Sequence, residues 1–249
     1  MPEPPAAERA MRVLGDVVGD SRPRLPGDGE DPAIPVAATV ILVRDAPSGP
    51  EVLLIERPDR GSFAGAWVFP GGKLDEGDRV EGATEEDSAR RAGIRETWEE
   101  VGLVLDGETL VTLSLWDPPP GLPLRIRTWF FIAPAPGGVL ALSPDETVAA
   151  EWVRPEDLLE RHGRGELTLY PPTWVTLFGL AGQSTADAVF AAARLGGLRR
   201  YETIARRGET GPMLLWPEDA EYDHDAGVAA SARHRLEVGS LPWVYTRGG

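Results

Sequence analysis

The sequence predicts an α/β protein with a mixed sheet, helices on both sides of that sheet, and a helical C-terminal extension. Three observations lead to this class. Apolar runs with strand character recur between residues 36 and 154, a segment of helix length interrupts them at 84–102, and more helical segments follow residue 155. The 249 residues are enough to bury a sizeable core, and no internal repeat is visible.

We divide the chain into an N-terminal arm and linker (1–34), a principal domain (35–163) and a C-terminal extension (164–249) that packs on the domain. The arm is expected to hold a short helix from Ala7 to Val18, followed by a linker rich in proline and glycine. The expected strands of the principal domain are 36–44, 51–57, 66–72, 109–116, 124–133 and 147–154. Between them, residues 73–83 are polar and glycine-bearing, so we expect an exposed loop.

The principal helix has clear ends. Thr84 followed by Asp87 resembles a capping box and opens a helix of about 17 residues, which Gly102 can terminate. Another helix is expected at 155–163, beginning with a proline, and two more at 171–182 and 184–197. Beyond Gly197 the candidate strands are "YETIARR" and "GPMLLWPED".

Composition excludes several classes of protein. There are no cysteines, so disulfides, thiolate catalysis and cysteine-ligated metals are ruled out. A net charge of −15 argues against broad binding to nucleic acid or anionic membranes. No apolar run could span a membrane and the N-terminus does not resemble a signal peptide, so we expect a cytoplasmic protein. His162, His224 and His234 show no ligand spacing and are expected to be ordinary surface or loop residues.

The stretch "IRETWEEVGL" (94–103) carries the most information about function. Glu96, Glu99 and Glu100 share one helix face. Glutamate-rich faces are usually just solvated, but here like charges lie four residues apart, and the last turn of a helix disfavours anions. A bound Mg²⁺ or Mn²⁺ would reverse each of these small penalties, because carboxylate oxygens are the ligands that such ions select.

Two further faces of this helix have different characters. Ala89, Ala92 and Gly93 are small, and they would let another backbone or a ligand come close. Ile94, Trp98 and Val101 form the apolar stripe that we expect to anchor the helix in the core.

These residues resemble a known family. "RETWEEVGL" (95–103) is similar to the second half of the Nudix box, and "FPGGKLDEGD" (69–78) looks like its first half. The resemblance extends over roughly 35–160 and implies a Nudix-type α/β/α sandwich. It also implies a hydrolase of acid anhydrides, which cleaves a diphosphate linked to another group with Mg²⁺ or Mn²⁺.

The Nudix box of this chain departs from the family signature in one respect. Between Gly72 and Arg95 there are 22 residues, nine more than the signature has. Counted from the glycine, the first acidic position is Asp78; counted from the arginine, it is Asp87. The insertion is either a tolerated surface loop or a lid beside the diphosphate.

The insertion, a partial "LLIERPDR" element and "LTLYPPTWVTL" resemble the Nudix branch that includes peroxisomal CoA diphosphatases, although the chain ends "YTRGG" and not with a peroxisomal signal. The resemblance implies a small nucleotide diphosphate as substrate, with a CoA-type compound slightly ahead of ADP-ribose or a nucleotide sugar. The alternative is a weakly catalytic Nudix module that binds a nucleotide. Whether the chain forms a homodimer is left open.

The resemblance also assigns roles to residues. It implies Glu99 and Glu100 as principal metal ligands, Glu96 as a ligand or water-activating group, and Arg95 as the residue that orients them. The backbone of Gly71 and Gly72 can approach substrate or metal because neither has a Cβ. The remaining candidates are Glu146 or Glu151 as general base, Arg57 and Arg60 as partners of a substrate phosphate, and Trp67 and Trp129 as stacking or core residues.

Overall fold

The computed structural model describes residues 15, 18, 21–25, 27–29, 31–60, 63–122, 125–222 and 227–248. The helix expected from Ala7 to Val18 falls almost wholly outside these residues, and His224 lies outside them. Within the described part, no helix has the length and apolar character needed to cross a membrane.

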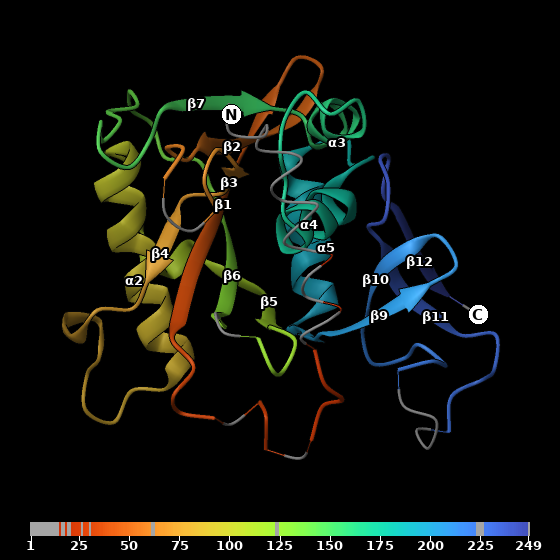
Figure 1. Cartoon of the computed structure of the whole chain (residues 1–249). Helices are drawn as coiled ribbons and strands as arrows, with labels where there is room; N and C mark the ends of the chain where they lie inside the picture. Colours follow the sequence, from red (N-terminus) through yellow and green to blue (C-terminus); the bar gives the residue numbers. More distant parts are fainter. Residues whose placement is uncertain are drawn as a thin grey trace, which may run out of the picture.

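A mixed, eight-stranded sheet forms the centre of the protein (Figure 1), in the order β3-β2-β1-β6-β5-β8, with β4 beside β1 and β7 beside β2. β1 (Val36–Ala46) runs parallel to β6 (Arg127–Pro134) and antiparallel to β2 (Gly49–Glu56). The other strands are β3 (Trp67–Val68), β4 (Gly71–Lys73), β5 (Val111–Asp117), β7 (Ala149–Val153) and β8 (Arg199–Glu202). The hairpin expected from 109–116 and 124–133 forms as β5 and β6.

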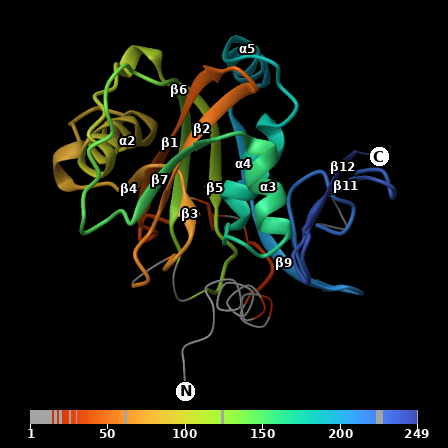
Figure 2. The same ribbon diagram turned by 90° about the horizontal axis from the view of Figure 1, so that it is seen from above.

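The two faces of the sheet belong to two different cores. Val40 and Leu42 of β1 pack in the core under α2 (Glu85–Val101), whereas Ile41 and Val43 point to the other side. This alternation follows from the two-residue period of a strand, and it makes β1 apolar throughout because both faces are covered. Three helices cover the second face (Figures 1 and 2): α3 (Pro155–Gly163), α4 (Pro171–Leu180) and α5 (Ala186–Gly196).

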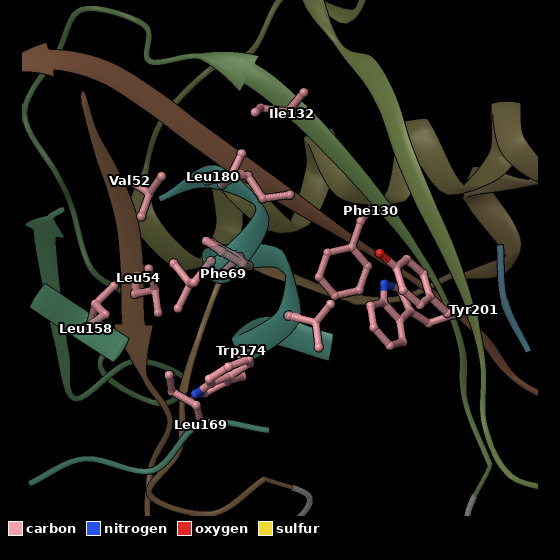
Figure 3. Packing of buried hydrophobic residues seen from close by; sticks show 14 of the residues in the cluster. Val52, Leu54, Phe69, Phe130, Ile132, Leu158, Leu169, Trp174, Leu180 and Tyr201 are labelled. Atoms are coloured by element: carbon pink, nitrogen blue, oxygen red, sulfur yellow. The ribbon is translucent and has the colours of Figure 1, made fainter. Parts of the chain in front are cut away.

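The second core extends into the C-terminal part of the chain. Figure 3 shows side chains of β2, β6, α3, α4 and β8 converging in it. Leu214 and Leu236 from a second, four-stranded antiparallel sheet belong to the same core, together with Trp216, which follows one of its strands. The strands of this sheet are β9 (Ile204–Gly208), β10 (Gly211–Leu215), β11 (Arg233–Glu237) and β12 (Val244–Gly248).

The C-terminal extension is therefore helical only in its first part. Both helices expected there form, and "YETIARR" and "GPMLLWPED" supply strands, as the sequence suggested. β11 and β12 were not anticipated. β11 reads "RHRLE" and contains one apolar residue, Leu236. Its charged neighbours Arg233, Arg235 and Glu237 leave no apolar pattern that would predict a strand.

α2 has the expected ends, and two of its three expected anchors are confirmed, because Val101 is fully buried and Ile94 packs against the same core. Thr84 and Asp87 form the capping box, and Gly102 ends the helix with φ +72°. The small face docks on the sheet, because a Cβ on Gly93 would lie 2.9 Å from a methyl of Val40. The prediction that Trp98 anchors the helix was wrong: 57% of it is exposed. The tight fit against β1 leaves room only for small side chains.

The expectation for the histidines was also wrong for the two that the structure describes. His162 and His234 are 3% and 4% exposed. The His162 ring meets Trp243 edge-on, with 4.5 Å between ring centroids. Burial lowers the pKa of His162 to about 4, so the folded protein holds this ring neutral.

This burial predicts a pH-dependent stability. Below pH 6.5 the unfolded chain binds a proton at His162 that the folded protein does not bind, so the free energy of unfolding falls as the pH approaches 4. His162→Phe keeps an aromatic ring and removes the imidazole that binds this proton. The variant should therefore gain stability over the wild type as the pH falls from 7 to 4, by up to about 3 kcal/mol.

Urea unfolding of both proteins at several pH values measures the difference, in which other titrating groups largely cancel. Parallel curves of unfolding free energy against pH would contradict the prediction.

Candidate functional site

Two glycines bring β4 against β1 and α2. Gly71 has φ +154°, and a Cβ on it would lie 2.2 Å from the carbonyl oxygen of Ala38. A Cβ on Gly72 would overlap the Glu96 carboxylate, at 2.3 Å from its Cδ. Thr39 fixes the turn before them, because its hydroxyl donates to the carbonyl of Pro70 at 2.8 Å. The "FPGG" turn thus lies in contact with the glutamates of α2.

Glu100 is the most deeply buried acid of the group. Its side chain is 1% exposed and accepts hydrogen bonds from the backbone N–H of Gly71 (2.8 Å) and from Nη1 of Arg57 (2.6 Å). Burial raises the pKa of Glu100 to about 8 against the effect of these donors, and the charges of Glu96 and Glu146 act in the same direction as burial. A cation near Glu100 would therefore be strongly favoured.

Arg95 links the other two glutamates to the loop before the helix. Its Nη1 donates to Glu96 and to Glu99, each at 2.9 Å. Its Nη2 donates to the carbonyl of Lys73 (3.0 Å) and to Asp78 (2.9 Å). One guanidinium therefore fixes β4, the loop and the glutamate face of α2 relative to one another.

Glu96 and Glu99 differ in exposure. The Glu96 side chain is 15% exposed, and burial raises its pKa although Arg95 opposes the change. The Glu99 side chain is 40% exposed, and it lies at the rim. The structure thus brings together the three glutamates that the sequence placed on one helix face, and it adds Arg95 and the backbone of Gly71 and Gly72.

Asp78 and Asp87 have separate tasks. Asp78 is 4% exposed and bonded to Arg95, which holds its pKa below the usual value although burial alone would raise it. Asp87 bonds Thr84 at the start of α2. The acidic position counted from Gly72 therefore meets the site. The extra residues lead from Asp78 to the first turn of α2. That turn lies about 20 Å from Glu99 along the helix axis.

The two candidate bases also lie in different places. Glu146 is exposed on the loop before β7, and its charge raises the pKa of both Glu96 and Glu100. Its loop is tied to the end of α2, where the backbone N–H of Ser143 donates to the carbonyl of Glu100 at 3.0 Å. Glu151 is paired with Arg161 at 2.8 Å on the side of α3. Only Glu146 faces the glutamates.

The remaining candidates are spread around the rim. Arg57 is bound to Glu100, a role that the sequence did not suggest, and Arg60 donates to the carbonyl of Asp145 at 2.7 Å. Trp129 is 5% exposed and its indole N–H donates to Glu85, so it is a core residue. Trp67 is half-buried with the guanidinium of Arg161 over its ring.

Sequence reasoning missed Thr39 and the pairing of Arg57 with Glu100. Thr39 lies in β1, where a threonine reads as an ordinary strand residue. Arg57 lies 43 residues from Glu100, and no local spacing links the two.

The donor set of the site fits a hard divalent cation. Glu96, Glu99 and Glu100 supply carboxylate oxygens, and burial raises the pKa values of Glu96 and Glu100 although Arg95 and Arg57 oppose the change. Within the described residues, no three acidic or histidine side chains are gathered closely enough to hold an ion as they stand. Arg95 holds Glu96 and Glu99, so these side chains would have to rotate toward the ion.

Comparison with known proteins found similarity to Nudix hydrolases. A Caenorhabditis elegans protein named nudix hydrolase 1 is 32% identical to this chain over 127 residues. The match covers 49% of this chain and 29% of the relative, which is less than a third of that protein. The crystal structure of a NUDIX hydrolase from Alicyclobacillus acidocaldarius is 25% identical, with a TM-score of 0.57, and covers 64% of this chain and 96% of that chain.

The crystal structure of a MutT NUDIX hydrolase from Burkholderia pseudomallei is 28% identical, covers 58% of this chain and 95% of that chain, and has a TM-score of 0.45. The family model of the NUDIX domain matches residues 33–171, which is more than half of the chain. With the glutamates, Arg95 and the glycine turn in contact, this match shows that the chain belongs to the Nudix family of hydrolases.

Proposed function

We propose that this Nudix hydrolase cleaves the diphosphate of a nucleoside diphosphate linked to another group, and that it depends on Mg²⁺ or Mn²⁺. The observation that carries the proposal is the contact between the Gly71–Gly72 backbone and the carboxylates of Glu96 and Glu100. A phosphate group is tetrahedral and anionic, and a glycine backbone lets it approach without steric conflict. We also propose that residues 35–163 form the Nudix domain and that residues 164–249 form a C-terminal extension.

Glu96, Glu99 and Glu100 would hold the cation, with the Gly72 backbone beside them. When bound, the cation supplies electrostatic stabilisation of the charge that develops on the diphosphate oxygens. Arg95 keeps Glu96 and Glu99 oriented through bonds of 2.9 Å. Glu146, on its own loop beside the site, is our candidate to accept the proton of the attacking water, and the bond of Glu151 to Arg161 makes Glu151 the less favoured alternative.

For the substrate, a CoA-type compound stays ahead of ADP-ribose and nucleotide sugars by a narrow margin. Its support is the sequence resemblance together with Arg60, whose side chain is 69% exposed at the rim and could meet an additional phosphate. Arg57 is a weaker candidate for a phosphate partner than the sequence suggested, because its guanidinium is already paired with Glu100. A metal-dependent activity distinguishes all of these from a nucleotide-binding module without catalysis.

The first experiment tests the cation. Saturating Mn²⁺ should raise the midpoint of thermal unfolding, because binding to the folded state alone stabilises it. Glu99→Gln should reduce the rise, whereas Glu108→Gln, at an exposed glutamate of the segment that follows the Nudix box, should not. An unchanged midpoint, together with no binding heat in calorimetry, would contradict the metal site.

The second experiment tests catalysis. Glu99→Gln keeps the size of the side chain and removes a ligand charge, so turnover should fall on the order of a hundredfold or more while the protein stays folded. Circular dichroism and thermal unfolding establish the fold, and Glu108→Gln again serves as the control. Near-normal turnover of the Glu99 variant would refute the role assigned to this residue.

The third experiment identifies the substrate class. CoA, dephospho-CoA, ADP-ribose and a nucleotide sugar are compared under identical Mg²⁺ and Mn²⁺ conditions, and kcat/KM should be highest for a CoA compound. A far higher value for ADP-ribose or the sugar would remove the CoA preference and leave the hydrolase intact. No metal-dependent turnover of any diphosphate would favour the binding module.

A further inference from the structure

A cavity of about 50 Å³ lies on the face of the sheet opposite to α2. α4 and α5 form its walls, and β5 and β8 form its floor. Five polar residues line it, and the rest of its surface is apolar or glycine. The polar residues are Ser114, Thr176, Gln183, Arg199 and Tyr201.

The lining is selective in its chemistry. Each of the five polar side chains carries a hydrogen-bond donor, and none is a carboxylate. This is notable in a chain with 40 acidic residues against 25 basic ones. Another hollow, beside the start of α5, is lined by Asp45, Glu108 and Asp187 in addition to two arginines. The cavity between α4 and α5 therefore offers donors without competing acids.

The hydroxyl groups of Ser114 and Thr176 can make hydrogen bonds beyond those seen in the described residues. Ser114 is 3% exposed, and its oxygen accepts a bond from the indole N–H of Trp116 at 3.0 Å, which leaves its own O–H to donate elsewhere. Thr176 is 7% exposed, and its hydroxyl bonds no other described residue. The hydroxyl of Thr97 in α2, by contrast, donates to the carbonyl of Gly93 at 2.7 Å.

Arg199 supplies the positive charge. In the described part of the chain it has no ion pair and donates no hydrogen bond, whereas Arg247 is paired with Glu218 at 3.1 Å. Its guanidinium lies against the end of α5, with Nη2 3.1 Å from the place a Cβ would take on Gly196. The C-terminal end of a helix carries about half a negative charge, which favours a cation there without an acidic partner.

We propose that this cavity binds a phosphate-sized oxyanion, at a site separate from the Nudix carboxylates. One water needs roughly 10–15 Å³ of such a cavity, so its volume of about 50 Å³ suits about three to five heavy atoms, and orthophosphate with its five is at the upper end of that range. The end of α5 by itself opposes an anion. The full charge of Arg199 exceeds that partial charge, so binding depends on this one side chain. The oxyanion is either free orthophosphate or the phosphate group of a monoester.

The test uses the full chain in EDTA, so that divalent cations do not contribute to binding at the Nudix carboxylates. Inorganic phosphate and AMP are titrated separately, with amide shifts of Ser114, Thr176 and Gly197 followed by NMR. Both should cause saturable shifts at these residues. Equal dissociation constants would identify free phosphate as sufficient, and tighter binding of AMP would identify a monoester.

Arg199→Gln should weaken binding at least tenfold. Arg200→Gln is the matched control, because Arg200 is the next residue, is also exposed, and alternates to the other face of β8. The control should bind as the wild type does. Equal binding by the Arg199 variant, or no saturable shift of these amides in the wild type, would overturn the proposal while leaving the Nudix activity untouched.

Discussion

The site depends on the fork of donors that Arg95 presents. A guanidinium is planar and permanently charged, so its bonds to Asp78, Lys73, Glu96 and Glu99 are set in fixed directions. It joins a loop, a strand and a helix, in addition to the bond that the Gly71 backbone donates to Glu100. The arginine also offsets part of the repulsion between carboxylates at a helix end. A lysine could supply the charge but not four directed bonds at once.

Close packing makes this arrangement possible. α2 approaches β1 through Ala89, Ala92 and Gly93, and that approach carries Glu96 and Glu100 to the glycines of β4. Burial raises the pKa of Glu100 although the charge of Arg57 acts in the opposite direction, so the fold keeps an acid where burial opposes its charge. Such groups are frequent at functional sites, because a ligand that restores the balance is bound more strongly. Stability and function thus oppose each other at this helix end.

The opposite face of the sheet has a different task. It joins α3, α4, α5 and the second sheet into one large apolar core, with Trp116 and Tyr201 stacked at 3.8 Å between them. This core fixes the C-terminal extension to the Nudix domain. The donor-lined cavity under α4 and α5 lies at its edge. The sheet therefore has the glutamates of α2 over one side and a hollow lined by hydroxyl groups and Arg199 on the other.

The sequence by itself determined the features that depend on neighbours along the chain. The ends of α2, the shared face of Glu96, Glu99 and Glu100, and the period of β1 all follow from spacing of a few residues. Only the tertiary structure decided that Asp78 meets Arg95, that Arg57 meets Glu100, that Trp98 is exposed, and that His162 and His234 are buried. These outcomes join residues that are distant in sequence, and the folded packing alone specifies their distances.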